Sequence, residues 1–298
     1  MSRADHNAPL SDARPEVAWV NGHAAEQVSV LERGLQYGDG LFETIACVEG
    51  RPRLLERHLE RLAMGCARLG IEGIEPTELG AEIRSLAAEA ERAIIKLILT
   101  RGPALARGYA PTGRESPTRI ALRYAWPVQE TSGEAGVRVR IARLRLGENP
   151  ALAGLKHLNR LEQVLARREW SDPHIAEALL FSGSGALISG TMTNVFIVID
   201  SKLYTPRLDR CGVAGVMRRL VLEVAAAAGV PAEERSLDAH ALESAQELFL
   251  TNALIGIRPV GELEGKRFAP GPVTARLSER VDARLKSAPP APRGGAGA

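Results

Sequence analysis

The sequence has few cysteines, few aromatic residues and no long hydrophobic run. Its three cysteines, Cys47, Cys66 and Cys211, form no CxxC pair and no spacing typical of metal ligands. An odd number of scattered cysteines indicates reduced thiols and an intracellular protein. No segment approaches the ~20 apolar residues of a membrane-spanning helix. The first residues lack the apolar run of a secretory signal as well. We therefore expect a cytoplasmic protein without a membrane span.

A strong net charge is also absent. The formal net charge of +2 is too small to indicate nucleic acid or an anionic membrane as a partner. Arg138, Arg140, Arg143 and Arg145 follow one probable strand, a pattern more typical of a solvated face than of a phosphate track. The six histidines are scattered without ligand spacing, so no metal site is predicted.

The composition is that of an ordinary globular protein, with 45% hydrophobic and 25% charged residues among 298. This length suits two domains of ~150 residues each. A Ser/Gly/Glu-containing stretch, 127–136, is the expected linker between domains at 17–126 and 137–287. Residues 1–16 are polar without periodicity, and 288–298 are rich in Pro, Gly and Ala, so both ends are expected to be disordered.

Strand and helix patterns alternate in the first half. Asn21-Gly22 is typical of a hairpin turn. It predicts strands at Val17–Val20 and Gln27–Leu31 on its two sides. A helix with apolar spacing is expected from Leu55 to Leu69, ending at Gly70. Further elements are expected in this order: a helix from Thr77 to about Arg92 and strands at 93–100 and 119–126.

The second half shows the same mixture, which predicts an α/β fold. Alternation at Val137, Val139 and Ile141 indicates a half-buried strand. The remaining predicted elements are strands at 177–181, 194–199 and 247–252, a helix after Gly212–Gly215 that runs to Gly229, and a terminal helix at 272–286.

Lys156 is the leading candidate for a reactive residue. Leu158, Leu161 and Leu165, with Val164 beside them, recur at helical spacing and predict a buried stripe. Lys156 would then lie where a loop enters a packed helix. A lysine amine in a desolvated pocket becomes nucleophilic, and its commonest use is a Schiff base with a carbonyl. The alternative is an ordinary solvated surface lysine.

Several motifs carry a resemblance to a known family. Ala153–Leu165, AGLKHLNRLEQVL, resembles the lysine segment of aminodeoxychorismate lyases. These are pyridoxal phosphate enzymes of fold type IV, which also includes branched-chain and D-amino acid aminotransferases. Similar matches occur in YGDGLFET at 37–44, HLERL at 58–62 and GVAGVMR at 212–218, and the resemblance covers roughly residues 17–285. Taken alone, these three motifs could equally be a turn, a solvated helix arginine and an ordinary helix start.

The resemblance implies a two-domain α/β fold like that of D-amino acid aminotransferase, with pyridoxal 5'-phosphate between the domains, and a homodimer. It makes Lys156 the catalytic residue that binds the cofactor. The other cofactor-binding residues that it implies are Arg61, Ser189, Asn194, Val216, Met217 and Asn252. Tyr37, Arg107 and Tyr109 are the implied substrate contacts.

One position departs from the family pattern. Relatives usually carry glutamate five residues before the asparagine of the Asn-x-Phe strand, where it pairs with the pyridine nitrogen. In this sequence Ser189 stands five residues before Asn194. A hydroxyl can form a hydrogen bond there but supplies no negative charge.

The resemblance implies a lyase that converts 4-amino-4-deoxychorismate to p-aminobenzoate and pyruvate, a step in folate biosynthesis. A branched-chain or D-amino acid aminotransferase is the nearest alternative, since fold and cofactor are shared. The Lys-His-Leu-Asn-Arg context and the Arg107-Gly-Tyr109 loop favour the lyase. A cofactor-binding protein without catalytic activity is a third alternative.

Overall fold

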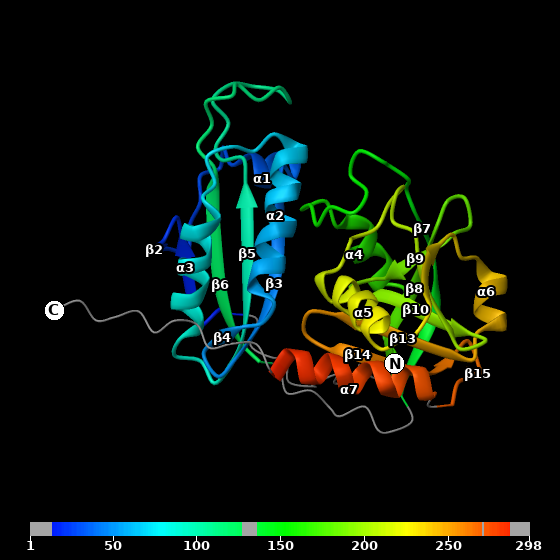
Figure 1. Ribbon diagram of the computed structural model, residues 1–298. Coiled ribbons are helices and arrows are strands. Elements are labelled where there is room, and N and C mark those ends of the chain that lie inside the picture. Colours follow the sequence, from blue (N-terminus) through cyan, green and yellow to red (C-terminus); the bar gives the residue numbers. More distant parts are fainter. Residues whose placement is uncertain (1–13, 127–135, 270, 287–298) are drawn as a thin grey trace, which may run out of the picture.

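Two β-sheets organise the chain in the computed structural model, which describes residues 14–126, 136–269 and 271–286. The expected disordered ends and the expected linker at 127–136 lie wholly or mostly outside these ranges. The sheets occupy separate halves of the molecule, and helix α2 lies on the side of the first half that faces the second (Figure 1).

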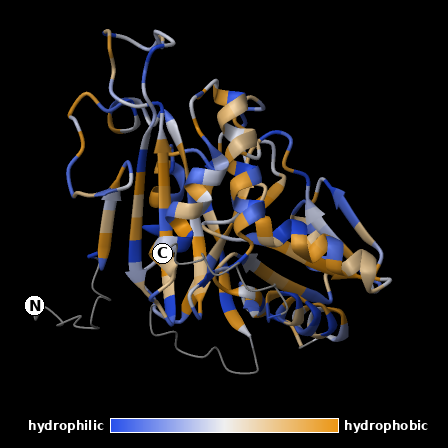
Figure 2. Ribbon diagram, turned by 60° about the vertical axis from the view of Figure 1, so that its left-hand side comes forward, coloured by the Kyte–Doolittle hydropathy of each residue, from blue (hydrophilic) through white to orange (hydrophobic). Residues whose placement is uncertain are grey.

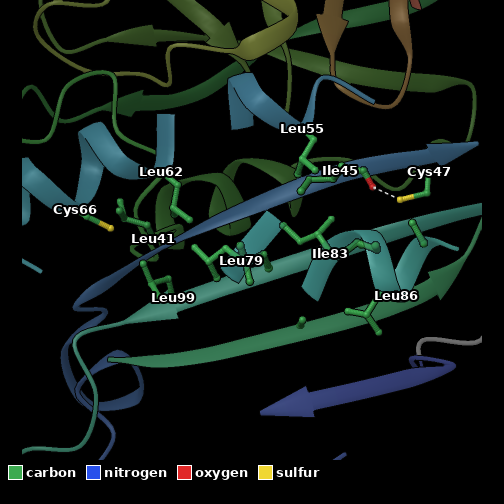
Figure 3. Packing of buried hydrophobic residues seen from close by; sticks show 14 of the residues in the cluster. Leu41, Ile45, Cys47, Leu55, Leu62, Cys66, Leu79, Ile83, Leu86 and Leu99 are labelled. Atoms are coloured by element: carbon green, nitrogen blue, oxygen red, sulfur yellow. Dashed lines mark hydrogen bonds between the residues drawn. The ribbon is translucent and has the colours of Figure 1, made fainter. Parts of the chain in front are cut away.

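The first sheet is antiparallel, with strand order β2-β1-β6-β5-β3-β4. Its helices α2 and α3 cover one face. The apolar residues of α2 and α3 pack with those of β3 and β5 to form the first core (Figure 3). The elements of this half are β1 (Val17–Val20), β2 (His23–Ala24), α1 (Arg33–Tyr37), β3 (Gly40–Val48), β4 (Arg51–Pro52), α2 (Leu55–Leu69), α3 (Pro76–Ala87), β5 (Arg92–Thr100) and β6 (Thr118–Ala125).

The second sheet is mixed, with the order β12-β11-β10-β13-β14-β7-β8-β9, and β15 pairs with β14. Apolar residues follow the strands of both sheets (Figure 2) and form cores on both faces of this one. Phe196 and Phe249 stack with ring centroids 4.9 Å apart in one of these cores. Its elements are β7 (Val137–Leu146), α4 (Leu161–Arg167), β8 (Ile175–Ser182), β9 (Leu187–Gly190), β10 (Asn194–Ile199), β11 (Lys202–Pro206), α5 (Val216–Ala227), β12 (Ala232–Arg235), α6 (Ala239–Ser244), β13 (Glu247–Asn252), β14 (Gly256–Leu263), β15 (Lys266–Arg267) and α7 (Pro272–Lys286).

Most predicted elements are confirmed, but the return strand at Gln27–Leu31 is wrong. The short strand β2 pairs with β1 immediately after the Asn21-Gly22 turn. Later in this segment the backbone bonds locally instead, because the Ser29 hydroxyl accepts from Leu31 N at 3.1 Å and Ser29 O accepts from Glu32 N at 3.1 Å. Such local bonds compete with a strand ladder. Helix α3 also ends at Ala87, earlier than predicted.

The predicted buried stripe after Lys156 is wrong as well. Helix α4 begins only at Leu161, so Lys156 lies in irregular chain before it. Leu161, Val164 and Leu165 are 69%, 53% and 45% exposed in the single chain. The helical spacing is real, but α4 turns this face outward and buries Ala166 instead. The spacing of apolar residues predicts which face of a helix is apolar, but it does not predict whether another part of the protein buries that face.

Three of the four arginines of β7 have acidic neighbours, as expected for a solvated face. Arg138 lies 3.4 Å from Glu262, and Arg140 and Arg143 lie 3.6 Å and 3.8 Å from Glu169. Their charges are therefore paired with carboxylates rather than arranged as a phosphate track. No helix in the described parts of the chain combines the length and the apolar character that crossing a membrane requires.

The segment that carries Lys156 is docked onto the first half of the molecule. Phe42 N donates to Lys156 O at 2.9 Å, and Leu158 N donates to Gly40 O at 3.0 Å, so this segment pairs with the start of β3. Leu155 is 5% exposed and belongs to the first core. The second half of the sequence thus completes the packing of the first.

We predict that Leu155→Ala destabilises the protein by about 2–5 kcal/mol, because it leaves a cavity in a core to which both halves contribute. Urea unfolding followed by circular dichroism measures this loss. Met64→Ala, at an exposed position of α2, serves as the control and should change the free energy of unfolding by less than about 0.5 kcal/mol. Equal effects of the two variants would contradict the docking of Leu155.

Candidate active site

The Lys156 amine lies in a shielded position against an aromatic ring. Its Nζ is 4.1 Å from the centroid of the Phe42 ring. Burial, together with the positive charge of Arg61, lowers the pKa of Lys156 to about 8, although the carboxylate of Glu43 opposes this shift. About a tenth of the amine is therefore uncharged at pH 7, far more than at the ordinary lysine pKa of 10.5, and the uncharged form is the one that acts as a nucleophile or a proton acceptor.

A buried carboxylate organises the charges beside this lysine. Glu43 accepts from Arg61 Nε at 2.8 Å and Nη2 at 2.5 Å, and it lies 2.6 Å from His58 Nδ1. Burial raises the pKa of Glu43, but the charge of Arg61 and the hydrogen bond from His58 outweigh burial and lower it to about 2. Glu43 is therefore ionised at neutral pH and fixes the guanidinium of Arg61.

Arg61 reaches from α2 to the start of α5. Its Nη1 donates to Ala214 O at 3.0 Å. Helix α5 begins after Gly215 without a side-chain cap, so its first backbone N–H groups, those of Val216 and Met217 among them, are available to an anion. A guanidinium beside a helix N-terminus is well suited to a phosphate.

Gly215 is required by a close approach of Asn194. A Cβ atom at position 215 would lie 2.0 Å from Asn194 Oδ1. Asn194 Nδ2 donates to Val213 O at 2.9 Å, so its amide holds the loop that leads into α5. The structure thus brings Arg61, Asn194, Val216 and Met217 to one place. This glycine-lined cradle fits the phosphate of a cofactor such as pyridoxal phosphate.

Ser189 and Asn252 are both engaged by neighbouring backbone. The buried Ser189 hydroxyl donates to Gly190 O at 2.9 Å. Asn252 Oδ1 accepts from Leu254 N at 2.9 Å and Ile255 N at 3.0 Å, and its Nδ2 donates to Met192 O at 3.3 Å. Asn252 therefore closes a turn at the end of β13, next to the start of β10.

Glu177 is a buried acid that precedes Ser189 in the sequence, but its side chain lies on the opposite face of the sheet from Ser189. Ser189 pairs with Leu180, and alternation along β8 turns Leu180 and Glu177 to opposite faces. Glu177 accepts hydrogen bonds from Thr191 N, Met192 N and Thr193 Oγ1 at 2.9, 3.2 and 3.1 Å. Its carboxylate thus holds the turn between β9 and β10 and does not replace the glutamate usual at position 189.

The candidate substrate contacts form a separate group at the end of the first sheet. The rings of Tyr37 and Tyr109 meet edge to face with centroids 5.3 Å apart. Arg33 lies 5.1 Å from the Tyr37 ring and donates to Tyr109 O at 2.6 Å. Tyr109 is 83% exposed and Arg107 is exposed too, on the β5–β6 loop that projects beyond the sheet (Figure 1). The direct contacts of this group lead to Arg33 and not to Lys156.

Phe42, Glu43 and His58 are not among the site residues that the sequence predicts. A pattern that indicates them is present, since Glu43 interrupts the apolar face of β3 between Leu41 and Ile45. A carboxylate on a buried face requires a cationic or hydrogen-bonding partner. His58 and Arg61 stand three residues apart on the next helix and can both face it.

We predict that Glu43→Gln destabilises the protein by roughly 3–5 kcal/mol at pH 7, because it leaves Arg61 without its buried partner. For the unchanged protein, the low pKa of Glu43 stabilises the fold above its ordinary value of 4.5, and this contribution is lost as the pH falls toward about 2. Urea unfolding between pH 7 and pH 3 measures both effects. This role of Glu43 would be contradicted if the free energy of unfolding fell by the same amount in the variant and in the parent between pH 5 and pH 3.

The chain is similar to several known proteins over most of its length. The amino-transferase class IV family matches residues 40–263. A Vibrio harveyi aminodeoxychorismate lyase is 35% identical over 89% of this chain and 99% of its own length. A Methanocaldococcus jannaschii protein named putative branched-chain-amino-acid aminotransferase is 31% identical over 90% of this chain and 96% of its own length. The crystal structure of a Pseudomonas aeruginosa 4-amino-4-deoxychorismate lyase superposes with a TM-score of 0.87 at 46% identity, over 90% of this chain and 99% of that one.

The family match spans most of both domains, and the relatives align from end to end. The family resemblance and the two-domain α/β fold expected from the sequence are both confirmed. The chain belongs to the amino-transferase class IV family.

Proposed function

We propose that the protein is a pyridoxal phosphate-dependent lyase that converts 4-amino-4-deoxychorismate to p-aminobenzoate and pyruvate. The observation that carries the proposal is the shielded Lys156 amine, held against Phe42 and near the guanidinium of Arg61, which reaches the start of α5. The similarity to lyases at 35% and 46% identity over nearly the whole chain supports this substrate. p-Aminobenzoate is a folate precursor, which would place the enzyme in folate biosynthesis.

The cradle would hold the phosphate of the cofactor. Arg61, fixed by Glu43, would pair with it, and the first amides of α5 would donate to it. When bound, pyridoxal phosphate withdraws electrons from the carbon that carries the substrate amine. Ser189 would face the pyridine nitrogen with a neutral hydroxyl.

Lys156 would do the proton transfer. Its uncharged amine would take the proton from C4 of the substrate, since a base with a pKa near the working pH is the most effective. The electron pair left at C4 then forms the C3–C4 double bond and breaks the C3–O bond, and the enolate of pyruvate leaves and takes up a proton to give pyruvate. The ring that remains is aromatic. The chain contributes the base, its orientation and an apolar wall at Phe42.

We predict that Lys156→Ala lowers turnover by roughly 10²-fold to 10⁴-fold, because it removes the proton acceptor. The purified protein is incubated with aminodeoxychorismate and pyridoxal phosphate, without any keto acid, and p-aminobenzoate and pyruvate are measured. Lys202→Ala, an exposed lysine of β11 paired with Glu233, is the matched control and should retain full activity.

Equal, catalytic amounts of both products would establish the lyase. Failure to form them, with amino transfer from an amino acid to a keto acid, would assign the aminotransferase activity that the 31% identical relative suggests. Cofactor binding without either reaction would leave a binding protein.

We further propose that the protein is a cytoplasmic homodimer. The three cysteines are unpaired and buried, which suits a reducing compartment. An apolar rim of Leu35, Leu105, Leu161, Val164 and Leu165 is 45–69% exposed in the single chain. The two sides of this rim adjoin, because Asn159 before α4 donates to Gly38 O after α1 at 3.3 Å. Several exposed apolar side chains that lie close together typically mark a protein interface.

We predict that Leu161→Asp weakens the dimer at least about tenfold, because it places a charge in the apolar rim. Sedimentation equilibrium measures the dissociation constant. Met64→Asp, at an exposed apolar position of α2 outside the rim, should leave the constant unchanged. A monomeric parent protein, or a variant as dimeric as the parent, would reject this interface.

A further inference from the structure

Arg160 holds the peptide groups on both sides of Lys156. Its Nε donates to His157 O at 2.8 Å, and its Nη2 lies 3.4 Å from Leu155 O. The carbonyl of Lys156 itself accepts from Phe42 N at 2.9 Å. A backbone hydrogen bond thus joins Lys156 to β3. The guanidinium of Arg160 bonds to the carbonyl groups of the residue before Lys156 and the residue after it.

The shape of arginine explains why one side chain can do this. A guanidinium presents several N–H donors in a planar fork, and a lysine ammonium does not keep two fixed directions. Arg160 is also the last residue before α4, where its backbone is set by the start of that helix. The guanidinium is therefore carried by a residue at the start of helix α4, and it forms hydrogen bonds with the irregular segment that contains Lys156.

Arg160 also contributes positive charge to the surroundings of the Lys156 amine. Burial lowers the pKa of Lys156 most, followed by Arg61 of α2, and Arg160 and Lys96 of β5 add to this, whereas Glu43 of β3 opposes it. Burial lowers the pKa of Arg160 itself to about 10, so it keeps its charge at neutral pH. Arg160 therefore acts on the geometry of the lysine segment and on the charge of its amine.

We propose that Arg160 is the positioning residue for Lys156, because its two hydrogen bonds to the neighbouring carbonyls aim the amine. The positive charge of Arg160 acts on the same amine. This rests on the proposed role of Lys156 as the reacting amine. Arg160 does not touch the substrate in this scheme. Its effect passes through the segment from Leu155 to His157.

The test separates these two effects by following how fast Lys156 takes up pyridoxal phosphate. The full chain, freed of cofactor, is mixed with pyridoxal phosphate at a series of pH values, and the absorbance change is recorded. Lys156→Ala supplies the background from other lysines. The pH midpoint reports the pKa of the amine, and the plateau at high pH reports how well the uncharged amine is aimed.

We predict that Arg160→Gln raises the midpoint and so lowers the uncharged fraction of the amine below it, because a positive charge near the amine is lost. Its plateau should fall roughly tenfold from lost alignment. Arg160→Lys keeps the charge and loses the fork, so its midpoint should stay and its plateau should fall. Arg143→Gln, on the exposed side of β7, is the control and should match the parent. Circular dichroism confirms that each variant is folded.

Parent values of both midpoint and plateau in folded Arg160→Gln would overturn the proposal. An unchanged plateau in Arg160→Lys would overturn the grip alone and leave the charge effect. The outcome is independent of the lyase assay. If the parent forms no p-aminobenzoate but Arg160→Gln still changes both readouts, the proposed function fails and the positioning role stands.

Discussion

The attachment of the lysine segment to the first half of the molecule is the contact on which the site depends. Two backbone hydrogen bonds join this segment to the start of β3, and Leu155 inserts into the first core. Because Phe42 and Glu43 lie on β3 close to the point of attachment at Gly40, this attachment sets their distance from Lys156. The Lys156 amine and its surroundings therefore come from different halves of the chain, and packing between the halves determines the geometry of the candidate site.

The candidate phosphate site at Arg61 and the start of α5 depends on a second contact between the halves. Arg57 of α2 forms a two-point ion pair with Glu223 of α5 at 2.9 and 2.6 Å, and Arg219 reaches Glu60 at 2.8 Å. Partly exposed pairs of this kind contribute little to stability each. Their geometry matters more, since they align α2 with α5 and so hold Arg61 at the helix start where the amides of Val216 point. The site is thus built where these two helices meet.

The sequence predicted most elements and the family, because alternation, helical spacing and caps are local properties. Gly70 ends α2 with a φ of 62°, as its place after an amphipathic run predicts. What failed needed tertiary information. The outward face of α4 looks like a core face in sequence, and the pairing of Glu43 with Arg61 joins residues 18 positions apart. Motifs predicted Lys156 and Arg61 as site residues, but only the fold shows that both lie near the carboxylate of Glu43.

That environment explains how the pKa of one lysine can be lowered to about 8 beside an ionised glutamate. Glu43 faces two partners, His58 and Arg61, and both act to keep it negative. The nearby positive charge of Arg61 in turn disfavours a second positive charge on Lys156. A glutamate without these partners would raise the pKa of the lysine and hold it as an ion pair. Because Glu43 is engaged by Arg61, the amine of Lys156 stays free to exchange a proton.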